Sequence, residues 1–555
     1  MGKRIIIIGG LSAGPSAAAK ARRENEEAEI ILFEKTANIS YATCGIPYAL
    51  SGKIRSRDKL MVVKPDLLRK RFKIDVRLEE AVLAIDPKKQ EVSTHLGIYP
   101  YDKLIYATGG SPLIPPIKNL DSCDLWTTCK TIEDFDKIVK DKVLDDKKYV
   151  AIIGAGLIGL EAAENLQKIG KTVHIIEKSE RVLPILSPMS SRVIKGVLED
   201  EGIQLHLGTT AQELDLQNQR LIMEDGSVIQ ADYLIIGIGI RPNTQLLPEA
   251  DKAGNGALIV DAHMRTSLPN IYAAGDCVVM DHLITGHKGF FPMGTHSNKG
   301  GRAAGAHAAG NSDITFDGAY GTAIVQVFDY AMAKTGLTPC KEQEAFPYNS
   351  SLIIAGNTAG FYPDPSDVYV SLYYEPDTKV LVGAEVFGKK GVDKRIDVLS
   401  TAIYAQLTLH DLQNLDLAYA PSFSPAKDPV IVAGFAADNV EMSGFDTALP
   451  TELEAQILSG KDIQIIDVRN PDELEKLGKV IGAINIPLDE LRDNLDKISD
   501  NLPKYIYCAK GLRGYLATKI LENNGFRNLN NVAGGMTLWK LLKLPIERVE
   551  AFQTA

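Results

Sequence analysis

Val150-Ala-Ile-Ile-Gly154-Ala-Gly156-Leu-Ile-Gly159 is an apolar run that passes directly into a G-x-G-x-x-G pattern. After a strand and before a helix, such glycines allow a tight turn, a close backbone approach to a pyrophosphate and close packing of the helix on the strand. The next apolar strand, residues 173–177, ends in Glu177, whose carboxylate is suited to accept hydrogen bonds from a ribose. The stretch therefore predicts a dinucleotide-binding strand, turn and helix.

A related pattern opens the chain. The β-branched run 4–8 ends in Gly9-Gly10-Leu11-Ser12-Ala13-Gly14, an Ala-rich helical stretch follows, and the strand 30–33 ends in Glu34. Gly9, Gly10 and Gly14 would serve the turn and Glu34 the ribose, although Leu11 stands where a middle glycine is usual. Two such motifs indicate two dinucleotide sites on one chain.

The acid of the second motif bears on the choice of nicotinamide nucleotide. Glu177 would repel the 2′-phosphate of NADPH, so NADH is favoured at the second site. The adjacent Lys178 leaves NADPH as the alternative. The first site is then free for a different dinucleotide.

Two further glycine turns follow in a fixed order. Tyr106-Ala-Thr108-Gly109-Gly110 closes the first nucleotide region, and Ile271-Tyr-Ala-Ala-Gly275-Asp276 follows a strand-like run. Each could be an ordinary glycine turn, but together with both dinucleotide motifs they resemble the landmarks of the pyridine nucleotide-disulfide reductase family. The resemblance implies FAD at the first site, with Thr108, Gly109 and Gly275 near it and Asp276 on the ribityl hydroxyls.

The expected fold class is α/β, with two Rossmann-like domains of the FAD/NAD(P)-linked reductase type. The chain changes character beyond Asn311, where alternating apolar strands at 369–374 and 380–386 precede a helix expected over 395–407. This part resembles the family's α+β dimerisation domain, which implies a homodimer. The expected domains are an FAD-binding domain at 1–112 and 255–320, an NAD(P)H-binding domain at 113–254, a dimerisation domain at 321–440, a linker at 441–450 and a smaller α/β domain at 451–550.

The composition is that of a globular enzyme, and it excludes several classes of function. The 555 residues are 45% hydrophobic and 24% charged, and the net charge of −10 argues against a general nucleic-acid surface. No apolar run is long enough for a signal peptide or a bilayer span, which predicts a cytoplasmic protein without membrane contact. The six cysteines form no C-x-x-C pair, so neither a disulfide framework nor a metal site is expected: Cys44, Cys123, Cys129, Cys277, Cys340 and Cys508.

Cys44 lies ten residues beyond Glu34, in Ser40-Tyr-Ala-Thr-Cys44-Gly45-Ile-Pro47-Tyr48. Many flavin disulfide reductases have two cysteines four residues apart, but Cys44 has no such neighbour, so its disulfide partner must come from a small molecule. Residues 1–440 resemble coenzyme A-disulfide reductases and their persulfide-reducing relatives. The bland alternative is a small buried core cysteine. A catalytic Cys44 must be a thiolate, which a helix N-terminus after Gly45 or nearby cations could favour.

Coenzyme A carries several phosphates, so its site should be basic despite the acidic total. Lys20, Arg22 and Arg23 on the first helix, and Lys70 and Arg71 further on, are candidates from charge alone; the last two could equally be solvated helix charges. The resemblance implies substrate contacts at Lys20, Arg23, Ser40, Asn298 and Lys427, with coenzyme A bound as substrate or ligand. It also implies that Tyr419, accompanied by Tyr362, reaches the partner subunit's active site, where Tyr419 could stabilise the leaving thiolate or position the disulfide; otherwise both tyrosines are packing aromatics.

The second distinctive cysteine is in Tyr505-Ile-Tyr507-Cys508-Ala-Lys-Gly511-Leu-Arg513-Gly514. A strand ending in Cys-x-x-Gly-x-Arg before a helix directs backbone N–H groups and the helix dipole at one sulfur. Residues 451–549 resemble a rhodanese domain, which implies that Cys508 carries sulfur and that Arg513 assists it. Lys479 stands where a histidine is common, and Gly514 where Ser or Thr is common. An inert module is the alternative, although such a module would lack the cysteine.

The combined hypothesis is an FAD-dependent NAD(P)H oxidoreductase that reduces coenzyme A disulfide, coenzyme A persulfide or polysulfide at Cys44. Cys508 would supply sulfane sulfur at a high effective concentration. One alternative is an NADH oxidase or peroxidase in which Cys44 cycles through sulfenic acid. The other is a redox-sensing sulfur-delivery protein whose flavin rarely turns over.

Overall fold

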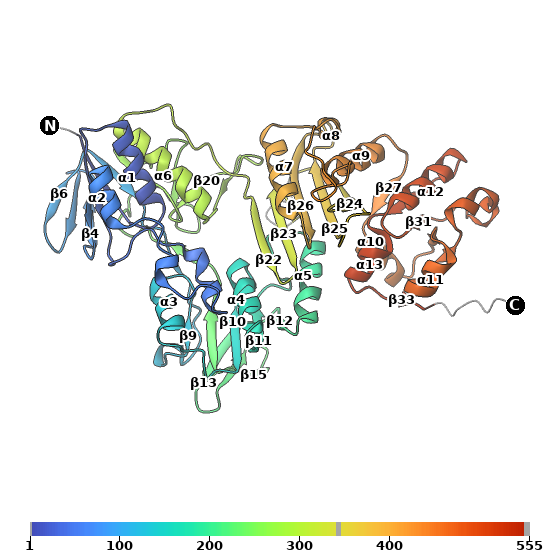
Figure 1. Ribbon diagram of the computed structural model, residues 1–555, viewed down its shortest axis with the longest axis horizontal. Helices are drawn as coiled ribbons and strands as arrows, with labels where there is room; N and C mark the ends of the chain where they lie inside the picture. Colours follow the sequence, from blue (N-terminus) through green and yellow to red (C-terminus); the bar gives the residue numbers. More distant parts are fainter. Residues whose placement is uncertain (1–2, 340–345, 549–555) are drawn as a thin grey trace. The chain divides into compact units, whose positions relative to one another are not determined.

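The computed structural model describes residues 3–339 and 346–548. They form two compact units, 3–180 with 202–321, and 181–201 with 322–339 and 346–548. Each unit contains two five-stranded sheets (Figure 1).

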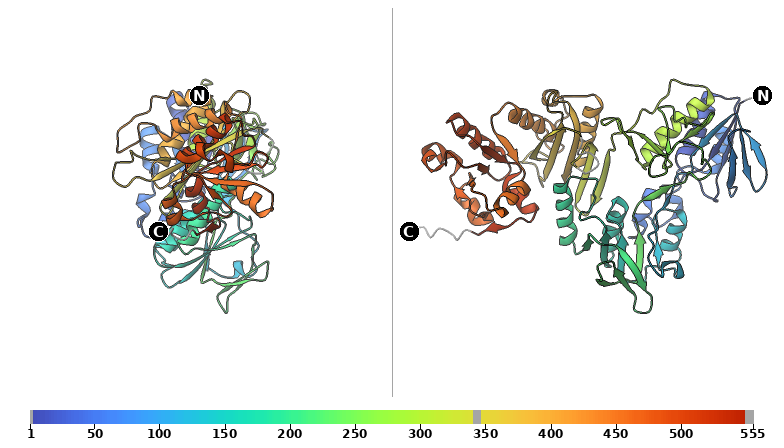
Figure 2. Two further views of the ribbon diagram at one scale, coloured as in Figure 1. Left: turned by 90° about the vertical axis from the view of Figure 1, so that its right-hand side faces the viewer. Right: turned by 180° about the vertical axis from the view of Figure 1, so that it is seen from behind.

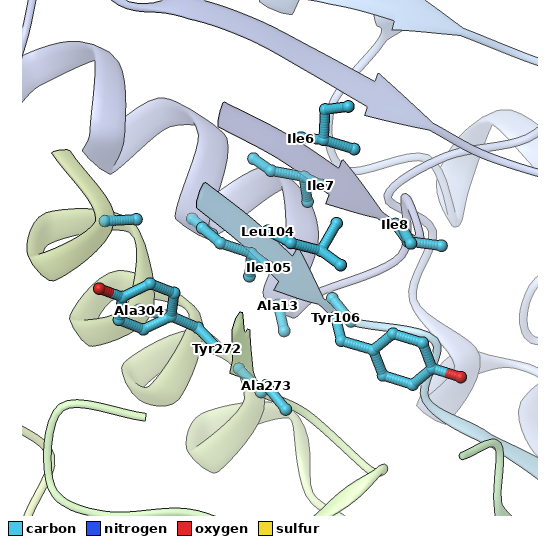
Figure 3. Packing of buried hydrophobic residues seen from close by; sticks show 14 of the residues in the cluster. Ile6, Ile7, Ile8, Ala13, Leu104, Ile105, Tyr106, Tyr272, Ala273 and Ala304 are labelled. Atoms are coloured by element: carbon cyan, nitrogen blue, oxygen red, sulfur yellow. The ribbon is translucent and has the colours of Figure 1, made fainter. Parts of the chain in front are cut away.

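The first sheet of the first unit is parallel, with strand order β19-β7-β1-β2-β3. Ile5, Ile6 and Ile7 of its central strand are fully buried, because helices cover one face and further chain the other. A parallel sheet buried on both faces favours a continuous β-branched run over alternation. Figure 3 shows Ile6 and Ile7 packed with Leu104, Ile105 and Ala13. The strands are β1 (Arg4–Ile8), β2 (Glu29–Phe33), β3 (Asp75–Arg77), β7 (Lys103–Tyr106) and β19 (Ile271–Ala273).

Two helices far apart in sequence lie side by side on this sheet, α1 (Ala13–Glu24) and α6 (Gly294–Ala309) (Figures 1 and 2). The first domain also contains α2 (Pro65–Phe72) and a small antiparallel sheet. The strands of this sheet are β4 (Val82–Asp86), β5 (Glu91–Thr94) and β6 (Ile98–Pro100). Two small sheets complete the first domain. In one, β8 (Gly110–Pro112) pairs with β17 (Ile240–Pro242), and in the other, β20 (Val278–Asp281) lies between β18 (Leu258–Ile259) and β21 (Lys288–Gly289).

The second sheet of this unit repeats the parallel design in the order β12-β11-β10-β16-β9. Its strands are β9 (Trp126–Thr127), β10 (Tyr149–Ile153), β11 (Thr172–Glu177), β12 (Gln204–Leu207) and β16 (Tyr233–Ile236). Its helices are α3 (Ile132–Val139) and α4 (Leu157–Gln167), and β13 (Ala211–Asp215), β14 (Arg220–Met223) and β15 (Val228–Gln230) form an antiparallel ribbon. Both predicted strand–turn–helix motifs are therefore present.

The second unit begins with an antiparallel sheet in the order β22-β23-β26-β25-β24. Its strands are β22 (Ala323–Val327), β23 (Tyr330–Gly336), β24 (Asn349–Gly356), β25 (Asp367–Tyr374) and β26 (Leu381–Gly388), with helices α7 (Val392–Tyr404), α8 (Leu409–Gln413) and α9 (Pro429–Glu441). The helix expected over 395–407 starts earlier, because Gly391 with φ 75° turns the chain into it. Helix α5 (Pro188–Asp200) belongs to this unit: Ser187 and Ser190 donate their hydroxyl groups to the buried Glu385 carboxylate, each at 2.6 Å.

The C-terminal sheet is parallel, in the order β27-β32-β31-β28-β30. Its strands are β27 (Asp446–Ala448), β28 (Gln464–Asp467), β30 (Ile484–Asn485), β31 (Lys504–Tyr507) and β32 (Leu529–Val532). Its helices are α10 (Pro450–Leu458), α11 (Pro471–Leu477), α12 (Leu512–Asn523) and α13 (Gly535–Leu541), and β29 (Lys479–Val480) pairs with β33 (Ile546–Glu547).

The segment 441–450, which we expected to be a linker, contains regular structure. Asp446–Ala448 pairs with β32, and Phe445 is 4% exposed in the core of the C-terminal sheet. The polar composition of this segment does not indicate a strand, because a short edge strand needs few apolar residues. With this difference, the expected α/β fold class with four folded parts is confirmed. No helix in the described residues is long and apolar enough to cross a membrane.

We predict that a pair of histidines makes the second sheet acid-sensitive. His174 Nδ1 lies 3.1 Å from His206 Nε2, and burial lowers the pKa of His174 from 6.5 to about 4 and lowers that of His206 as well. The folded state keeps His174 neutral where the unfolded chain takes up a proton, so the stabilisation is complete above pH 6.5 and is lost as pH falls towards 4.

The measurement is the thermal unfolding midpoint between pH 7.5 and 5. His174→Gln should give a shallower decline with falling pH than the wild type, whereas His410→Gln, at an exposed histidine, should leave the decline unchanged. An equal slope for wild type and His174→Gln would contradict the prediction.

Candidate active site and nucleotide sites

The first glycine turn depends on the absence of side chains. Gly9 has φ 106°, and a Cβ there would lie 2.2 Å from the carbonyl oxygen of Ala107. A Cβ on Gly14 would lie 1.9 Å from the carbonyl oxygen of Gly9. The chain therefore turns from β1 into α1 within a few residues, which exposes backbone N–H groups at the helix N-terminus to an anion.

The carboxylate of Glu34 is fixed beside this turn. Its Oε2 accepts a hydrogen bond from the N–H of Gly10 at 2.8 Å, and its Oε1 accepts from the N–H and the hydroxyl of Thr36, each at 2.9 Å. The carboxylate thus stands at the carboxyl end of β2, where a dinucleotide fold binds a ribose. The turn and the acid fit a bound FAD.

The other expected flavin residues meet at the same edge of the sheet. Thr108 and Gly109 follow β7, and Gly275 and Asp276 follow the neighbouring β19. Thr108 donates its hydroxyl to the carbonyl oxygen of Asn243 at 2.6 Å. Parallel strands bring their carboxyl ends to one edge, so these four residues gather although more than 160 positions separate the two turns in sequence.

Sequence reasoning missed the cation beside Asp276. Lys130 Nζ lies 3.2 Å from Asp276 Oδ2, and Ser297 donates its hydroxyl to Oδ1 at 3.3 Å. Lys130 precedes α3 in a segment without a motif, so no sequence signal distinguishes it. The aspartate is held by both partners at the cofactor edge.

The second glycine turn repeats the first. Gly154 has φ 107°, and a Cβ there would lie 2.6 Å from the carbonyl oxygen of Gly237, while a Cβ on Gly156 would meet nothing within 4 Å. A Cβ on Gly159 would lie 2.1 Å from the Gly154 carbonyl oxygen. Glu177 accepts from the N–H groups of Ala155 and Ser179, each at 2.8 Å. The open space beside Gly156 and the fixed acid fit a second dinucleotide.

Cys44 is exposed, in a 3-10 turn over Thr43–Gly45. The helix N-terminus expected after Gly45 is absent, because a second 3-10 turn, Pro47–Ala49, follows directly. The buried Ser40 begins the segment with φ 46°, and its N–H donates to the carbonyl oxygen of Gly10 at 2.8 Å. This hydrogen bond ties the cysteine segment to the first glycine turn.

Tyr48 and Glu161 link the cysteine segment to the second nucleotide domain, which sequence reasoning missed. The Tyr48 hydroxyl donates to Glu161 Oε1 at 3.2 Å, and the Ser51 hydroxyl donates to Asn165 Oδ1 at 2.6 Å. Burial, followed by the nearby Glu161 charge, raises the pKa of Tyr48 to about 12, and burial raises the pKa of Glu161. Glu161 lies two residues beyond Gly159, so α4 presents it to the cysteine segment.

The expected basic contacts divide into two groups. Lys20 and Arg23 lie on α1 and Asn298 lies on the neighbouring α6 in the first unit, and Arg71 is exposed in the last turn of α2. Arg22 does not take part, because its guanidinium donates to the carbonyl oxygens of Phe72 and Lys73 at 2.8 and 3.0 Å. These hydrogen bonds of Arg22 therefore connect α1 to the C-terminal end of α2.

Tyr362, Tyr419 and the exposed Lys427 lie in loops of the second unit. The side chains of Tyr362 and Tyr419 are 40% and 53% exposed, so neither is a core residue. The Ala359 N–H donates to the carbonyl oxygen of Pro421 at 3.2 Å, which joins the two tyrosine-bearing loops.

A buried ion pair stabilises these loops. Arg395 Nη2 lies 3.0 Å from Asp428 Oδ2 and donates to the carbonyl oxygen of Asn357 at 3.1 Å. The hydroxyl of Ser424 donates to Asp428 at 2.8 Å. Asp428 also caps α9, so one buried carboxylate fixes both the loop and the helix that follows it.

Cys508 is 2% exposed at the end of β31, and its Sγ accepts a hydrogen bond from the Gly511 N–H at 3.1 Å. A Cβ on Gly535, which has φ 48°, would lie 2.1 Å from the carbonyl oxygen of Cys508. The loop then enters α12, so a backbone donor and a helix N-terminus both face the sulfur. Such a loop stabilises a thiolate or a persulfide anion.

The partner of Arg513 was not expected from the sequence. Its Nη1 and Nη2 donate to the two oxygens of Glu473 at 2.6 and 2.8 Å, which orients the guanidinium beside the cysteine loop. The bidentate hydrogen bonds also raise the pKa of Arg513 and lower that of Glu473.

Lys479 and Gly514, the two residues that are unusual for a rhodanese domain, both have close neighbours in the structure. Lys479 donates to the carbonyl oxygen of Ala483 at 3.0 Å and lies 3.3 Å from a Glu547 oxygen. A Cβ on Gly514 would lie 2.5 Å from Asn531 Oδ1, so the Ser or Thr common at that position would clash.

The remaining described cysteines have no catalytic surroundings. Cys129 and Cys277 are buried, and burial raises the pKa of both thiols, to about 12 for Cys277. Cys123 is half-buried, and Cys340 lies outside the described residues. Within residues 3–339 and 346–548, no group of three His, Cys, Asp or Glu side chains is arranged to hold a metal ion.

Three family models match consecutive parts of the chain. They are the pyridine nucleotide-disulphide oxidoreductase at 3–310, its dimerisation domain at 322–429 and the rhodanese-like domain at 449–542.

Named relatives and a solved structure agree with these matches. An NADH oxidase of Methanocaldococcus jannaschii is 33% identical over 78% of this chain and 97% of its own length. An NAD(P)H coenzyme A polysulfide/persulfide reductase of Pyrococcus horikoshii is 33% identical over 78% and 98%. The reduced CoADR-RHD of Bacillus anthracis is 34% identical, covers 98% of both chains and has a TM-score of 0.93.

We predict that alanine substitutions at two glycines of the second turn affect different properties, stability at Gly154 and nucleotide binding at Gly156. Gly154→Ala should lower the unfolding midpoint, because its φ is positive and its Cβ would meet a carbonyl oxygen; the cost is about 1–3 kcal/mol. Gly156→Ala should leave the midpoint unchanged but raise the KM for NADH about tenfold or more, because its Cβ would enter the space needed by the pyrophosphate. Thermal unfolding and steady-state kinetics measure both effects, and the reverse pattern would contradict the assignment.

Proposed function

The chain belongs to the pyridine nucleotide-disulphide oxidoreductase family, and from this premise we propose that it reduces coenzyme A disulfide, coenzyme A persulfide or polysulfide at Cys44. One observation carries the proposal: the exposed Cys44 lies in a segment whose Ser40 N–H is hydrogen-bonded to the first glycine turn, and no second described cysteine lies in that segment. A lone thiol beside a flavin needs a sulfur substrate from outside the chain.

In the proposed reaction the Cys44 thiolate attacks the substrate's sulfur–sulfur bond, a new sulfur–sulfur bond to Cys44 forms, and coenzyme A thiolate leaves, or the shortened polysulfide where polysulfide is the substrate. FAD, when bound, would supply the two electrons, received from NADH, that reduce this new bond and return the Cys44 thiolate, with the second sulfur released as coenzyme A thiol or hydrogen sulfide. Asp276 with Lys130, and Glu34 with the Gly10 N–H, orient that cofactor. Glu177 binds the ribose of the nicotinamide nucleotide, with NADH favoured over NADPH.

Cys508 has the second role in the proposal, as a carrier of sulfane sulfur. The Gly511 N–H stabilises the anionic sulfur, and Arg513, oriented by Glu473, attracts an anionic donor. Because both cysteines belong to one chain, sulfur released from Cys508 has a high effective concentration near Cys44.

The proposal includes a homodimer and a cytoplasmic location. The half-exposed Tyr362 and Tyr419 support a dimer in which each chain completes the partner's substrate site, with Tyr419 facing the leaving thiolate and Lys427 and Arg71 the phosphates. The free cysteines support a reducing compartment. The net charge of −10 supports small-molecule partners rather than nucleic acid.

The test is anaerobic NADH consumption with coenzyme A persulfide, coenzyme A disulfide and peroxide in parallel. We expect Cys44→Ser to lower persulfide-dependent turnover by a factor of roughly 10³ or more, because it removes the nucleophile. Cys508→Ser should keep turnover with coenzyme A disulfide and lose the acceptance of sulfur from thiosulfate. Cys123→Ser is the matched control and should behave as the wild type.

The competing function is that of an NADH oxidase or peroxidase, favoured by the name of the Methanocaldococcus relative. Peroxide turnover that exceeds persulfide turnover would establish this function, with Cys44 passing through sulfenic acid. Full sulfide release by Cys44→Ser would likewise overturn the sulfur-reductase proposal.

A further inference from the structure

The Cys508 loop (residues 508–511) contains a lysine whose partner comes from another domain of the second unit. Lys510 Nζ lies 2.6 Å from Asp367 Oδ1. Asp367 is the first residue of β25 in the antiparallel sheet, whereas the loop follows β31 of the C-terminal sheet. The ion pair therefore joins the loop of Cys508 to the dimerisation domain.

The dimerisation domain holds the Asp367 carboxylate in a fixed place. Asp367 pairs with Gly356 in the ladder of β24 and β25, and the preceding Ser366 N–H donates to Asn357 Oδ1 at 2.7 Å. The side chain of Asp367 is 27% exposed and that of Lys510 is 50% exposed. Because a lysine has a flexible four-carbon stem, Lys510 is the partner that can turn away. A partly exposed pair of this kind is weak and is screened by salt.

Arg513, the second cation beside the cysteine, is neutralised within its own domain. Its guanidinium donates to both oxygens of Glu473 at 2.6 and 2.8 Å. By contrast, no carboxylate of the described residues 446–548 lies within 4.0 Å of Lys510 Nζ. Without Asp367 the loop would have an uncompensated positive charge, which attracts anions.

A cavity of about 470 Å³ lies beside the ion pair. Asp367 and Lys510 both line it, together with Thr358, Ser366 and Pro425. The Ser366 hydroxyl oxygen is buried and has no hydrogen-bond partner in the described part of the chain. The cavity volume is within the range of small-molecule sites, roughly 300–1,000 Å³, and an ammonium and a hydroxyl group are both donors to an oxyanion.

We propose that Asp367 is a specificity-determining residue for sulfur donors, because its carboxylate competes with an anionic donor for Lys510. The donor class that it disfavours is a small oxyanion with a terminal sulfane sulfur, of which thiosulfate is the simplest. The inference rests on the proposed role of Cys508 as a sulfur carrier. Nothing in the rhodanese-like part of the sequence indicates Asp367, which stands 143 positions before Lys510 in a different domain.

The reaction that reports on this competition is a transfer of one sulfur atom. The Cys508 thiolate attacks the outer sulfur of thiosulfate, a sulfur–sulfur bond forms on Cys508, and sulfite leaves with the electron pair of the broken bond. Thiolate and thiosulfate thus become a persulfide anion and sulfite, so no oxidant or reductant is needed. Since Lys510 acts on the binding of the dianion, the ion pair should change the donor concentration at half-saturation and leave the limiting rate unchanged.

The C-terminal domain keeps other contacts when this pair opens, because α5 also holds it. Arg192 lies 2.8 Å from Glu454, and Lys543 lies 2.7 Å from Asp200. Loss of the interdomain pair should therefore change the charge at the cysteine loop without releasing the domain.

The experiment follows sulfite release from thiosulfate in single turnovers of the FAD-loaded full chain, with Cys44→Ser to remove the second reactive thiol. Asp367→Asn should lower the half-saturating thiosulfate concentration about two- to fivefold, in keeping with a weak, partly exposed pair. Lys510→Gln should raise it, and the double variant should match Lys510→Gln alone, because Asp367 acts only through Lys510. Asp364→Asn removes an exposed carboxylate from the connection before β25 and is the matched control.

Alkylation of Cys508 gives a readout that does not depend on sulfur transfer. Iodoacetate is an anion and iodoacetamide is neutral, and both react with the same thiolate. Mass spectrometry of the peptide that contains Cys508 measures each rate. Asp367→Asn should speed the reaction with iodoacetate about two- to fivefold and leave the reaction with iodoacetamide unchanged.

An unchanged response of Asp367→Asn to both thiosulfate and iodoacetate would overturn the proposal. An equal acceleration with iodoacetamide would also contradict it, because the pair would then only cover Cys508. If the wild type releases no sulfite while the difference with iodoacetate is present, the proposed carrier role of Cys508 fails and the role of Asp367 remains.

Discussion

The close approach of backbone to backbone at the two glycine turns is the constraint on which the structure depends. At Gly9 and Gly154 the chain adopts positive φ, and each glycine lies where a Cβ would meet the carbonyl oxygen of the loop after a neighbouring strand. These contacts let each parallel sheet end in a short turn, with the helix N-terminus above its carboxyl edge. The residues expected to bind the cofactors lie at that edge because parallel strands bring all their carboxyl ends together.

The two distinctive cysteines lie in different surroundings. Cys44 is exposed on a 3-10 turn, whereas Cys508 is nearly buried and its sulfur accepts a hydrogen bond from a backbone N–H. An exposed thiol suits exchange with a bulky disulfide. A thiol enclosed by a loop and a helix N-terminus suits storage of a persulfide, because fixed dipoles stabilise the anion without a counterion.

Residues that orient others are the ones that sequence reasoning missed. Glu473 orients Arg513, Lys130 lies beside Asp276, and Tyr48 donates to Glu161. Each partner comes from a different element, so no spacing in the sequence connects the two. By contrast, Glu34 and Glu177 could be predicted because each terminates the strand next to its own glycine turn, a local relation that the sequence preserves.

The sequence by itself determined the parallel sheets, the glycine turns, their acids and the two distinctive cysteines, because these depend on backbone geometry and on residues close together along the chain. Only the tertiary structure decided three other features. They are the edge strand at 446–448, the absence of an α-helix after Gly45, and the hydrogen bonds of Arg22 to the end of α2. The same holds for the packing of α6 against α1, since more than 280 residues separate Ala13 from Gly301. A Cβ on Gly301 or Gly305 would lie 2.3 or 2.2 Å from a carbonyl oxygen of α1, so only glycine permits this close approach of the two helices.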